Sequence, residues 1–105
     1  MKQNQLAAEP PHTVLLQNIN HPGSSRKADA AMATAMQEAL LACLPPSLPG
    51  LTLEQLRSAV LPKLPQNLFP GGAKAGWWLK AVQLDLEARR LILRDKGSPL
   101  RLRLA

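Results

Sequence analysis

Leucines recur at every second position near the end of the chain, and this pattern predicts a β-hairpin. The alternation covers residues 91–94 and 100–104, where the leucines of the second run are separated by arginines. A period of two is typical of half-buried strands. Between the runs, Lys96–Pro99 contains the Gly, Ser and Pro of a turn.

The length of this turn determines which residues face each other across the predicted hairpin. A turn of two or four residues places Leu93 opposite Leu102 and Arg94 opposite Arg101. The leucines then share one face and the arginines share the other. Like charges directly opposite each other destabilise a strand pair. The pairing of Arg94 with Arg101 therefore indicates either an anion bound between them or two solvated side chains that splay apart and cover apolar surface with their stems.

Apolar residues at helical spacing predict a first helix over Arg26–Leu44, a segment that is rich in Ala and contains no Gly or Pro. Ser24 or Ser25 is expected to cap its start. Pro45-Pro46 ends it, because proline lacks the amide that a helix needs.

Two further helices follow. Thr52 and Gln55 have the spacing of a capping box, which predicts that the second helix begins at Thr52. Pro62 ends this helix near Leu61. The third helix is predicted over Ala73–Arg90.

The third helix has an apolar stripe and a polar face. The stripe consists of Ala75, Trp78, Leu79, Val82 and Leu86, and the polar face of Lys80, Gln83, Glu87 and Arg90. This spacing predicts that Trp78 lies in the core and that Trp77, at the edge of the stripe, is partly exposed.

These elements together predict an α+β fold in which a three-helix core precedes the C-terminal β-hairpin. Thr13–Gln17 is rich in β-formers and is expected to add a short N-terminal strand. The preceding residues 1–12 are polar, contain Pro-Pro and are expected to form an arm. The chain of 105 residues is therefore expected to hold one domain, over residues 13–105.

Composition favours a binding protein over an enzyme. A single cysteine, Cys43, excludes an internal disulfide, and His12 and His21 lie in loop-like segments without carboxylates at metal-ligand spacing. We expect no catalytic site, no metal and no cofactor. The sequence shows neither a membrane-spanning apolar run nor a secretion signal, so a cytoplasmic location is expected.

The charge is strongly basic and concentrated toward the C-terminus. The sequence has 13 Lys and Arg against seven Asp and Glu, a net charge of +6. Residues 71–105 carry eight of the basic side chains and three of the acidic ones, which accounts for five of the six positive charges. An excess of this kind favours polyanionic partners.

The order of three helices followed by a hairpin resembles a winged helix-turn-helix domain. Leu86-Glu87 near the end of the third helix and Leu91-Ile92 at the start of the hairpin have the spacing found in that family. Arg90 stands where winged helices usually have glycine. The resemblance implies that the third helix and the wing bind duplex DNA. The residues that would do so are Lys74, Lys80, Gln83, Arg94, Lys96, Arg101 and Arg103.

A second resemblance involves Phe69–Trp78, which is similar to a stretch in a small bacterial family without an assigned activity. Winged-helix domains also dock proteins. The alternative function is therefore a protein-interaction module, including self-association as a homodimer. Its surface would be formed by Leu68, Phe69 and Trp77.

Overall fold

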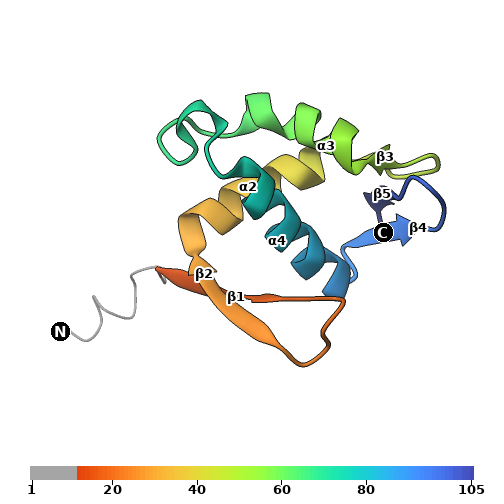
Figure 1. Ribbon diagram of the computed structural model, residues 1–105, viewed down its shortest axis with the longest axis horizontal. Helices are drawn as coiled ribbons and strands as arrows, with labels where there is room; N and C mark the ends of the chain where they lie inside the picture. The colour runs from red at the N-terminus through yellow and green to blue at the C-terminus, as the bar shows by residue number, and fades with distance from the viewer. Residues whose placement is uncertain (1–11) are drawn as a thin grey trace.

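A central helix, α4, is enclosed by two other helices, a β-hairpin and a small sheet in the computed structural model, which describes residues 12–105 (Figure 1). The strands are β1 (Thr13–Gln17), β2 (Ser25–Asp29), β3 (Leu51–Thr52), β4 (Ile92–Asp95) and β5 (Arg101–Leu104). The helices are α2 (Ala30–Cys43), α3 (Leu53–Val60) and α4 (Ala75–Ala88), with short 3-10 turns η1 (Leu61–Lys63) and η2 (Pro70–Gly72). The described residues thus form an α+β fold with two separate antiparallel sheets, β1-β2 and β3-β5-β4.

The N-terminal hairpin confirms the predicted strand and corrects the start of the first helix. β1 occupies Thr13–Gln17 as predicted, but residues 25–29 pair with it as β2 instead of beginning a helix. Pairing prevails because it buries Leu16 and Ala28 in the core. The helix α2 therefore starts at Ala30, and the predicted Ser24 or Ser25 cap is wrong. Asp29 is the N-cap, and its carboxylate accepts a hydrogen bond of 2.9 Å from the Met32 amide.

The predicted arm falls on residues that lie outside the described part of the chain, except for His12. The backbone oxygen of His12 accepts a hydrogen bond of 2.9 Å from the Ala30 amide. This contact joins the residue before β1 to the start of α2.

The capping box at the start of α3 is confirmed. The Gln55 amide donates to the Thr52 hydroxyl at 3.1 Å, and the Thr52 amide donates to the Gln55 side-chain oxygen at 3.0 Å. These two bonds satisfy amides that the first turn of a helix leaves unpaired. The Thr52 side chain thus fixes where β3 ends and α3 begins.

Both ends of α4 carry a residue in the left-handed region. Lys74, the N-cap, and Arg90, just beyond the C-terminus, each have a φ of 63°. The helix is therefore shorter than the predicted 73–90. The Arg90 amide donates to Glu87 and the Leu91 amide to Leu86, which closes the last turn before β4 begins.

The C-terminal hairpin is confirmed, but its predicted register is wrong by one residue. Ile92 faces Leu104, Arg94 faces Leu102 and Asp95 faces Arg101. The loop between the strands covers residues 96–100, an odd number, whereas the prediction assumed two or four. One extra loop residue shifts the register by one position, so the side chains of β4 lie on the opposite faces from those predicted. The predicted pairs Leu93–Leu102 and Arg94–Arg101 therefore do not form.

The inner face of the sheet therefore consists of residues other than those predicted for β4. Ile92 and Leu102 are buried, whereas Leu91 and Leu93 are exposed. β5 has the predicted orientation. β3 pairs along its other edge, with Leu51 opposite Leu102. Arg94 on β4 thus reaches Glu87 on α4, while its side chain remains partly exposed.

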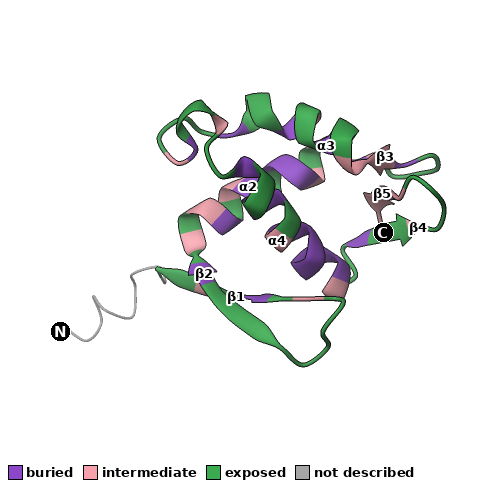
Figure 2. Ribbon diagram, viewed as in Figure 1, coloured by how far each residue is buried: buried purple, intermediate pink, exposed green. Residues whose placement is uncertain are grey.

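The core lies where α2, α3 and α4 meet and extends to the sheet and the hairpin. Trp78 is 7% exposed and Trp77 is 50% exposed, as the stripe on α4 predicts. Along the second half of α4, every residue from Val82 to Glu87 is buried (Figure 2). The predicted polar face of α4 is therefore covered at Gln83 and Glu87, because the hairpin and β4 pack on opposite sides of this half.

Candidate functional site

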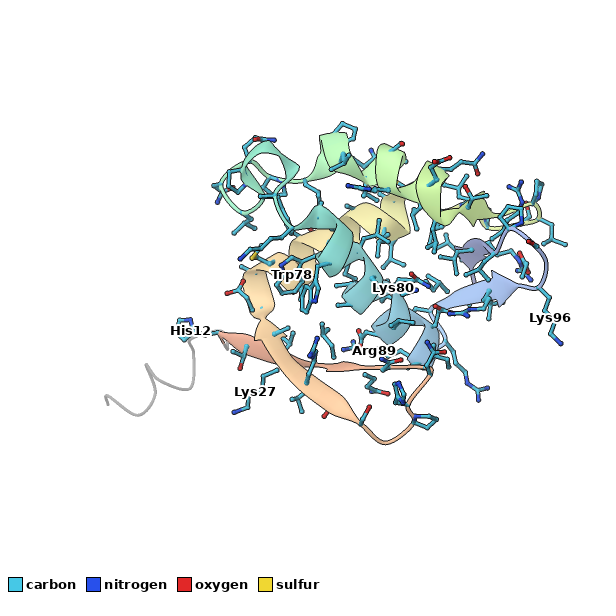
Figure 3. The ribbon with its side chains drawn as sticks, in the orientation of Figure 1. His12, Lys27, Trp78, Lys80, Arg89 and Lys96 are labelled. Atoms are coloured by element: carbon cyan, nitrogen blue, oxygen red, sulfur yellow. The ribbon has the colours of Figure 1, made fainter. Side chains whose placement is uncertain are left out.

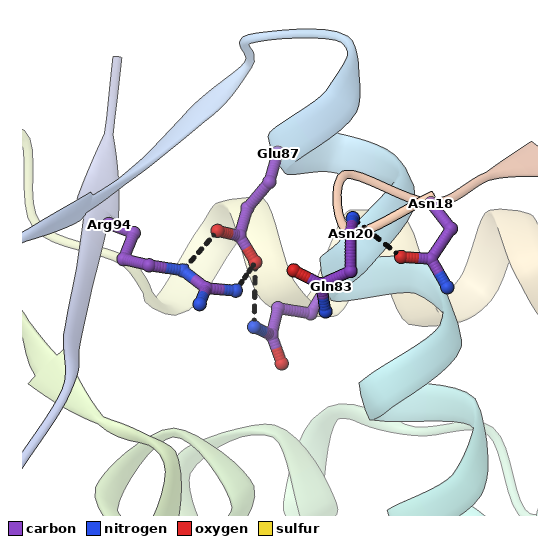
Figure 4. A network of polar contacts seen from close by, with 5 residues as sticks. All are labelled: Asn18, Asn20, Gln83, Glu87 and Arg94. Atoms are coloured by element: carbon purple, nitrogen blue, oxygen red, sulfur yellow. Dashed lines mark hydrogen bonds and ion pairs between the residues drawn. The ribbon is translucent and has the colours of Figure 1, made fainter. Parts of the chain in front are cut away.

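Arg94, one of the arginines predicted to bind phosphate, forms an ion pair within the fold. Its Nε lies 2.7 Å from Oε1 of Glu87 and its Nη2 lies 2.9 Å from Oε2 (Figure 4). The Glu87 side chain is only 4% exposed. The hydrogen bond to Glu87 raises the pKa of Arg94 above its ordinary value. Burial lowers the pKa in part, and the charge of Glu87 adds a further, weaker rise.

The other two wing arginines also have partners within the fold. Arg103 Nε lies 3.1 Å from Oδ1 of Asp95, and Arg101 Nη1 donates to the Gly50 backbone oxygen at 3.0 Å. Lys96, in the β4–β5 loop, is exposed and projects away from the domain (Figure 3). Of the four wing cations that the sequence predicts as phosphate contacts, only Lys96 makes neither an ion pair nor a side-chain hydrogen bond within residues 12–105.

Gln83 does not lie on the surface, contrary to the prediction. It is fully buried, and its Nε2 donates to Oε2 of Glu87 at 2.7 Å (Figure 4). Its Oε1 has no hydrogen-bond partner among the described residues. The side chain thus belongs to a buried Gln83–Glu87–Arg94 network that ties α4 to β4, and it is not available to read a base edge.

A second buried carboxylate holds the hairpin. Asp85 is 1% exposed, and its Oδ1 accepts a hydrogen bond of 2.8 Å from the Gln17 amide at the end of β1. Arg89, one turn further along α4, forms an ion pair with Asp85 at 3.2 Å. This contact fixes the position of the hairpin beside α4.

A groove of about 440 Å³ lies between the hairpin and the first half of α4. Its lining comes from both elements and from the loop of the hairpin, and consists of Leu16, Gln17, Asn18, Ser24, Ser25, Arg26, Trp77, Lys80, Ala81 and Leu84. The guanidinium carbon of Arg26 lies 5.5 Å from the centroid of a Trp77 ring, within the range of a cation–π contact. We call this feature the hairpin groove.

The hairpin groove is positively charged. Arg26 and Lys80 line it, neither forms an ion pair within residues 12–105, and none of its lining residues is acidic. Lys74, one turn before Trp77, is exposed at the start of α4. Two of the predicted α4 residues, Lys74 and Lys80, are thus exposed.

Lys80 also borders a second cavity of about 210 Å³ between α3 and α4, together with Arg57 and Gln83. Arg57 is an exposed cation on α3. Lys80 therefore lies between two cavities, each of which has a further arginine on its wall. We call the surface formed by Arg26, Arg57 and Lys80 the cationic face.

Arg26 and Arg57 were missed by the sequence analysis. Arg26 was assigned to a helix, and only its place in β2, opposite Leu16, turns it toward α4. Arg57 is an ordinary charged position on a short helix, and nothing in its sequence neighbours indicates that α4 places Lys80 nearby. The positions of Arg26 and Arg57 beside α4 therefore depend on tertiary packing.

Of the three residues predicted to form a protein-docking surface, Leu68, Phe69 and Trp77, only Trp77 is exposed. Phe69 is fully buried and Leu68 packs partly buried against the core, so the turn before α4 fills the core. Trp77 remains exposed, beside the hairpin groove. In the described part of the chain, no three His, Cys, Asp or Glu side chains gather as metal ligands, and no helix is long and apolar enough to cross a membrane.

Comparison with known proteins identifies a family but no activity. A family model described as a family of unknown function (DUF6958) matches residues 13–102. No curated protein and no solved structure matches the chain.

Proposed function

We propose that this chain, which belongs to a family of unknown function (DUF6958), binds nucleic acid, with duplex DNA as its target, through the cationic face around α4. The observation that carries the proposal is that Lys80 on α4 is exposed and shares one cavity wall with Arg26 and another with Arg57. Lys74 is exposed at the start of the same helix, and none of these four cations forms an ion pair within residues 12–105. Cations without carboxylate partners are free to neutralise phosphates and release counterions.

The order of elements supports the finer part of this proposal, a winged-helix mode of binding. A third helix is followed directly by a strand hairpin, and β3 pairs with the last strand of that hairpin. In such a mode α4 approaches the groove of the duplex, and Lys96 in the β4–β5 loop approaches a flanking phosphate. Arg94 and Arg103 contribute to the stability of the hairpin and not to phosphate binding, because each already neutralises a carboxylate.

A titration of labelled mixed-sequence duplex DNA at several salt concentrations tests the proposal. The logarithm of the affinity is expected to fall linearly with the logarithm of the salt concentration. Lys80→Gln should weaken binding to all sequences alike and reduce the slope by about one.

Lys63→Gln provides the matched control. It removes the same charge, but Lys63 follows α3 and lines a different cavity with Glu38. Its affinity and slope should equal those of the wild type. Equal effects of the two substitutions would mean that net charge alone determines binding, and absence of salt-dependent binding would refute the proposal.

Protein docking is the second candidate function, and the exposure of Trp77 favours it. An aromatic side chain that is 50% exposed beside a groove is typical of interaction surfaces. This function predicts that the mass in sedimentation rises with concentration or with an added partner. It also predicts that Trp77→Ala abolishes the rise in mass. The wild-type protein should then show no binding to duplex DNA.

A further inference from the structure

We propose that the hairpin groove receives a single unpaired nucleobase, stacked on Trp77, so that the protein prefers duplexes containing an unpaired base over fully paired ones. This inference rests on the proposed function and adds the feature of the nucleic acid that is recognised. The groove is formed by the N-terminal hairpin and α4, and thus differs from the wing that the sequence indicated.

The Arg26 guanidinium occupies the place beside the Trp77 ring that the base would take. This group, which is planar, lies 5.5 Å from the centroid of a Trp77 ring. Arg26 is exposed and forms no ion pair within residues 12–105, so little holds it in place. A base stacks on an aromatic ring more strongly than an exposed cation does. The base can therefore replace the guanidinium, which is then free to bind the adjoining phosphate.

Trp77 packs against Trp78, and this contact favours stacking because it orders the side chain in part. Its ring meets the buried ring of Trp78 edge-on, with centroids 5.0 Å apart and an interplanar angle of 84°. A side chain that is already ordered loses little conformational freedom when a ligand binds. Half of the Trp77 surface nevertheless remains exposed to receive the base.

The remaining walls of the groove suit a nucleotide better than an apolar peptide. Leu16, Ala81 and Leu84 provide an apolar floor. Asn18 Oδ1 accepts from the Asn20 amide and the Ser24 hydroxyl donates to the His21 backbone oxygen. The Asn18 amide nitrogen and the Ser25 hydroxyl remain for the edges of a base. Arg26 and Lys80 provide positive charge at the groove, and no lining residue is acidic. Stacking surface, edge partners and phosphate-binding cations thus occur in one site of about 440 Å³.

Three duplexes that differ only at one position test the inference. One is fully paired, one carries a single bulged thymidine, and one carries a bulged abasic nucleotide. The two bulged duplexes have the same phosphates and differ only in the base, so a difference in affinity between them measures the base itself. Wild-type protein is expected to bind the thymidine bulge about fivefold or more tightly than the abasic bulge.

A single-tryptophan variant reports where the base binds. The chain has two tryptophans, so Trp78→Phe leaves Trp77 as the only emitter, and the thymidine bulge should quench it more than the abasic bulge does. In the wild-type background, Trp77→Leu should remove the affinity difference between the bulges. Lys63→Gln, the matched surface control, should retain that difference.

The outcomes separate this inference from the proposed function. Equal affinities for the thymidine and abasic bulges, with salt-dependent binding of all three duplexes, would overturn the base site and leave the duplex-binding proposal intact. A difference that persists in Trp77→Leu would also overturn it. If no duplex shows salt-dependent binding, both proposals fail.

Discussion

Replacing Arg94 with glutamine should destabilise the fold, because Arg94 neutralises a buried carboxylate. Glu87 receives two hydrogen bonds from this guanidinium, at 2.7 and 2.9 Å, and one from Gln83 at 2.7 Å. Its side chain is 4% exposed, so water cannot replace the lost donors fully. Arg94→Gln leaves the carboxylate with the Gln83 amide as its principal donor.

The expected loss follows from the exposure of the two partners. Breaking a fully buried ion pair costs about 3–5 kcal/mol, and hydrogen bonds to charged groups contribute about 1.5–3 kcal/mol. The Arg94 side chain is 37% exposed, so water enters its place and compensates in part. We therefore expect the free energy of unfolding to fall by about 2 kcal/mol. In a domain of this size such a loss lowers Tm by about 10 °C.

Urea and thermal unfolding followed by circular dichroism measure this loss. Arg103→Gln is the matched control, since it removes the same charge from a pair whose acid, Asp95, is 22% exposed. It should cost less than about 1 kcal/mol. The double variant Glu87→Gln/Arg94→Gln should be more stable than Arg94→Gln alone, because no buried charge remains. Equal stabilities of Arg94→Gln and Arg103→Gln would refute the reasoning.

Three further predictions concern stability, each measured as the free energy of unfolding in urea. Trp78→Ala should cost about 3–5 kcal/mol because the ring is buried, and Trp77→Ala should cost less than about 1.5 kcal/mol; equal losses would mean that the core face of α4 is misassigned. Gly50→Ala should cost about 3 kcal/mol because its Cβ would overlap a backbone oxygen of β5, whereas Gly76→Ala, which meets nothing within 4 Å, should be neutral or stabilising. Arg90→Gly should stabilise by roughly 0.5–1 kcal/mol because the φ of 63° strains a side-chain-bearing residue, and a loss would show that the Arg90 side chain contributes more than this strain.

Local signals in the sequence were sufficient for the parts of the fold that depend on local chemistry. The Thr52–Gln55 capping box, the strand Thr13–Gln17 and the burial of Trp78 were all predicted and are all observed. In each case neighbouring residues decide the outcome, through caps, β-propensity or helical periodicity. The order of three helices followed by a hairpin was predicted for the same reason.

The errors arose where distant residues decide. One additional loop residue shifted the register of β4 and exchanged its two faces. Arg94 therefore contacts the Glu87 carboxylate instead of lying on the expected outer face. Residues 25–29 became a strand because β1 lies beside them, although their composition also suits a helix. Gln83 has the sequence pattern of a surface residue, but it is fully buried and donates to Glu87. The candidate site changed accordingly, from the wing to the hairpin groove, since its position depends on these same long-range contacts.

The pairing of β3 with β5 has a consequence for how the chain folds. Arg101 donates to the backbone oxygen of Gly50, and these residues are 51 positions apart, whereas β1 and β2 pair across a short loop. Closing a long segment costs more chain entropy than closing a short one, and non-local contacts slow folding. The two local hairpins, β1-β2 and β4-β5, can therefore form early. The pairing of β3 with β5 and the packing of α2 on α4 join segments far apart in the chain and complete the fold. Substitutions in β3 or in the interface between α2 and α4 should then mainly accelerate unfolding, while those in β1 and β2 should slow folding.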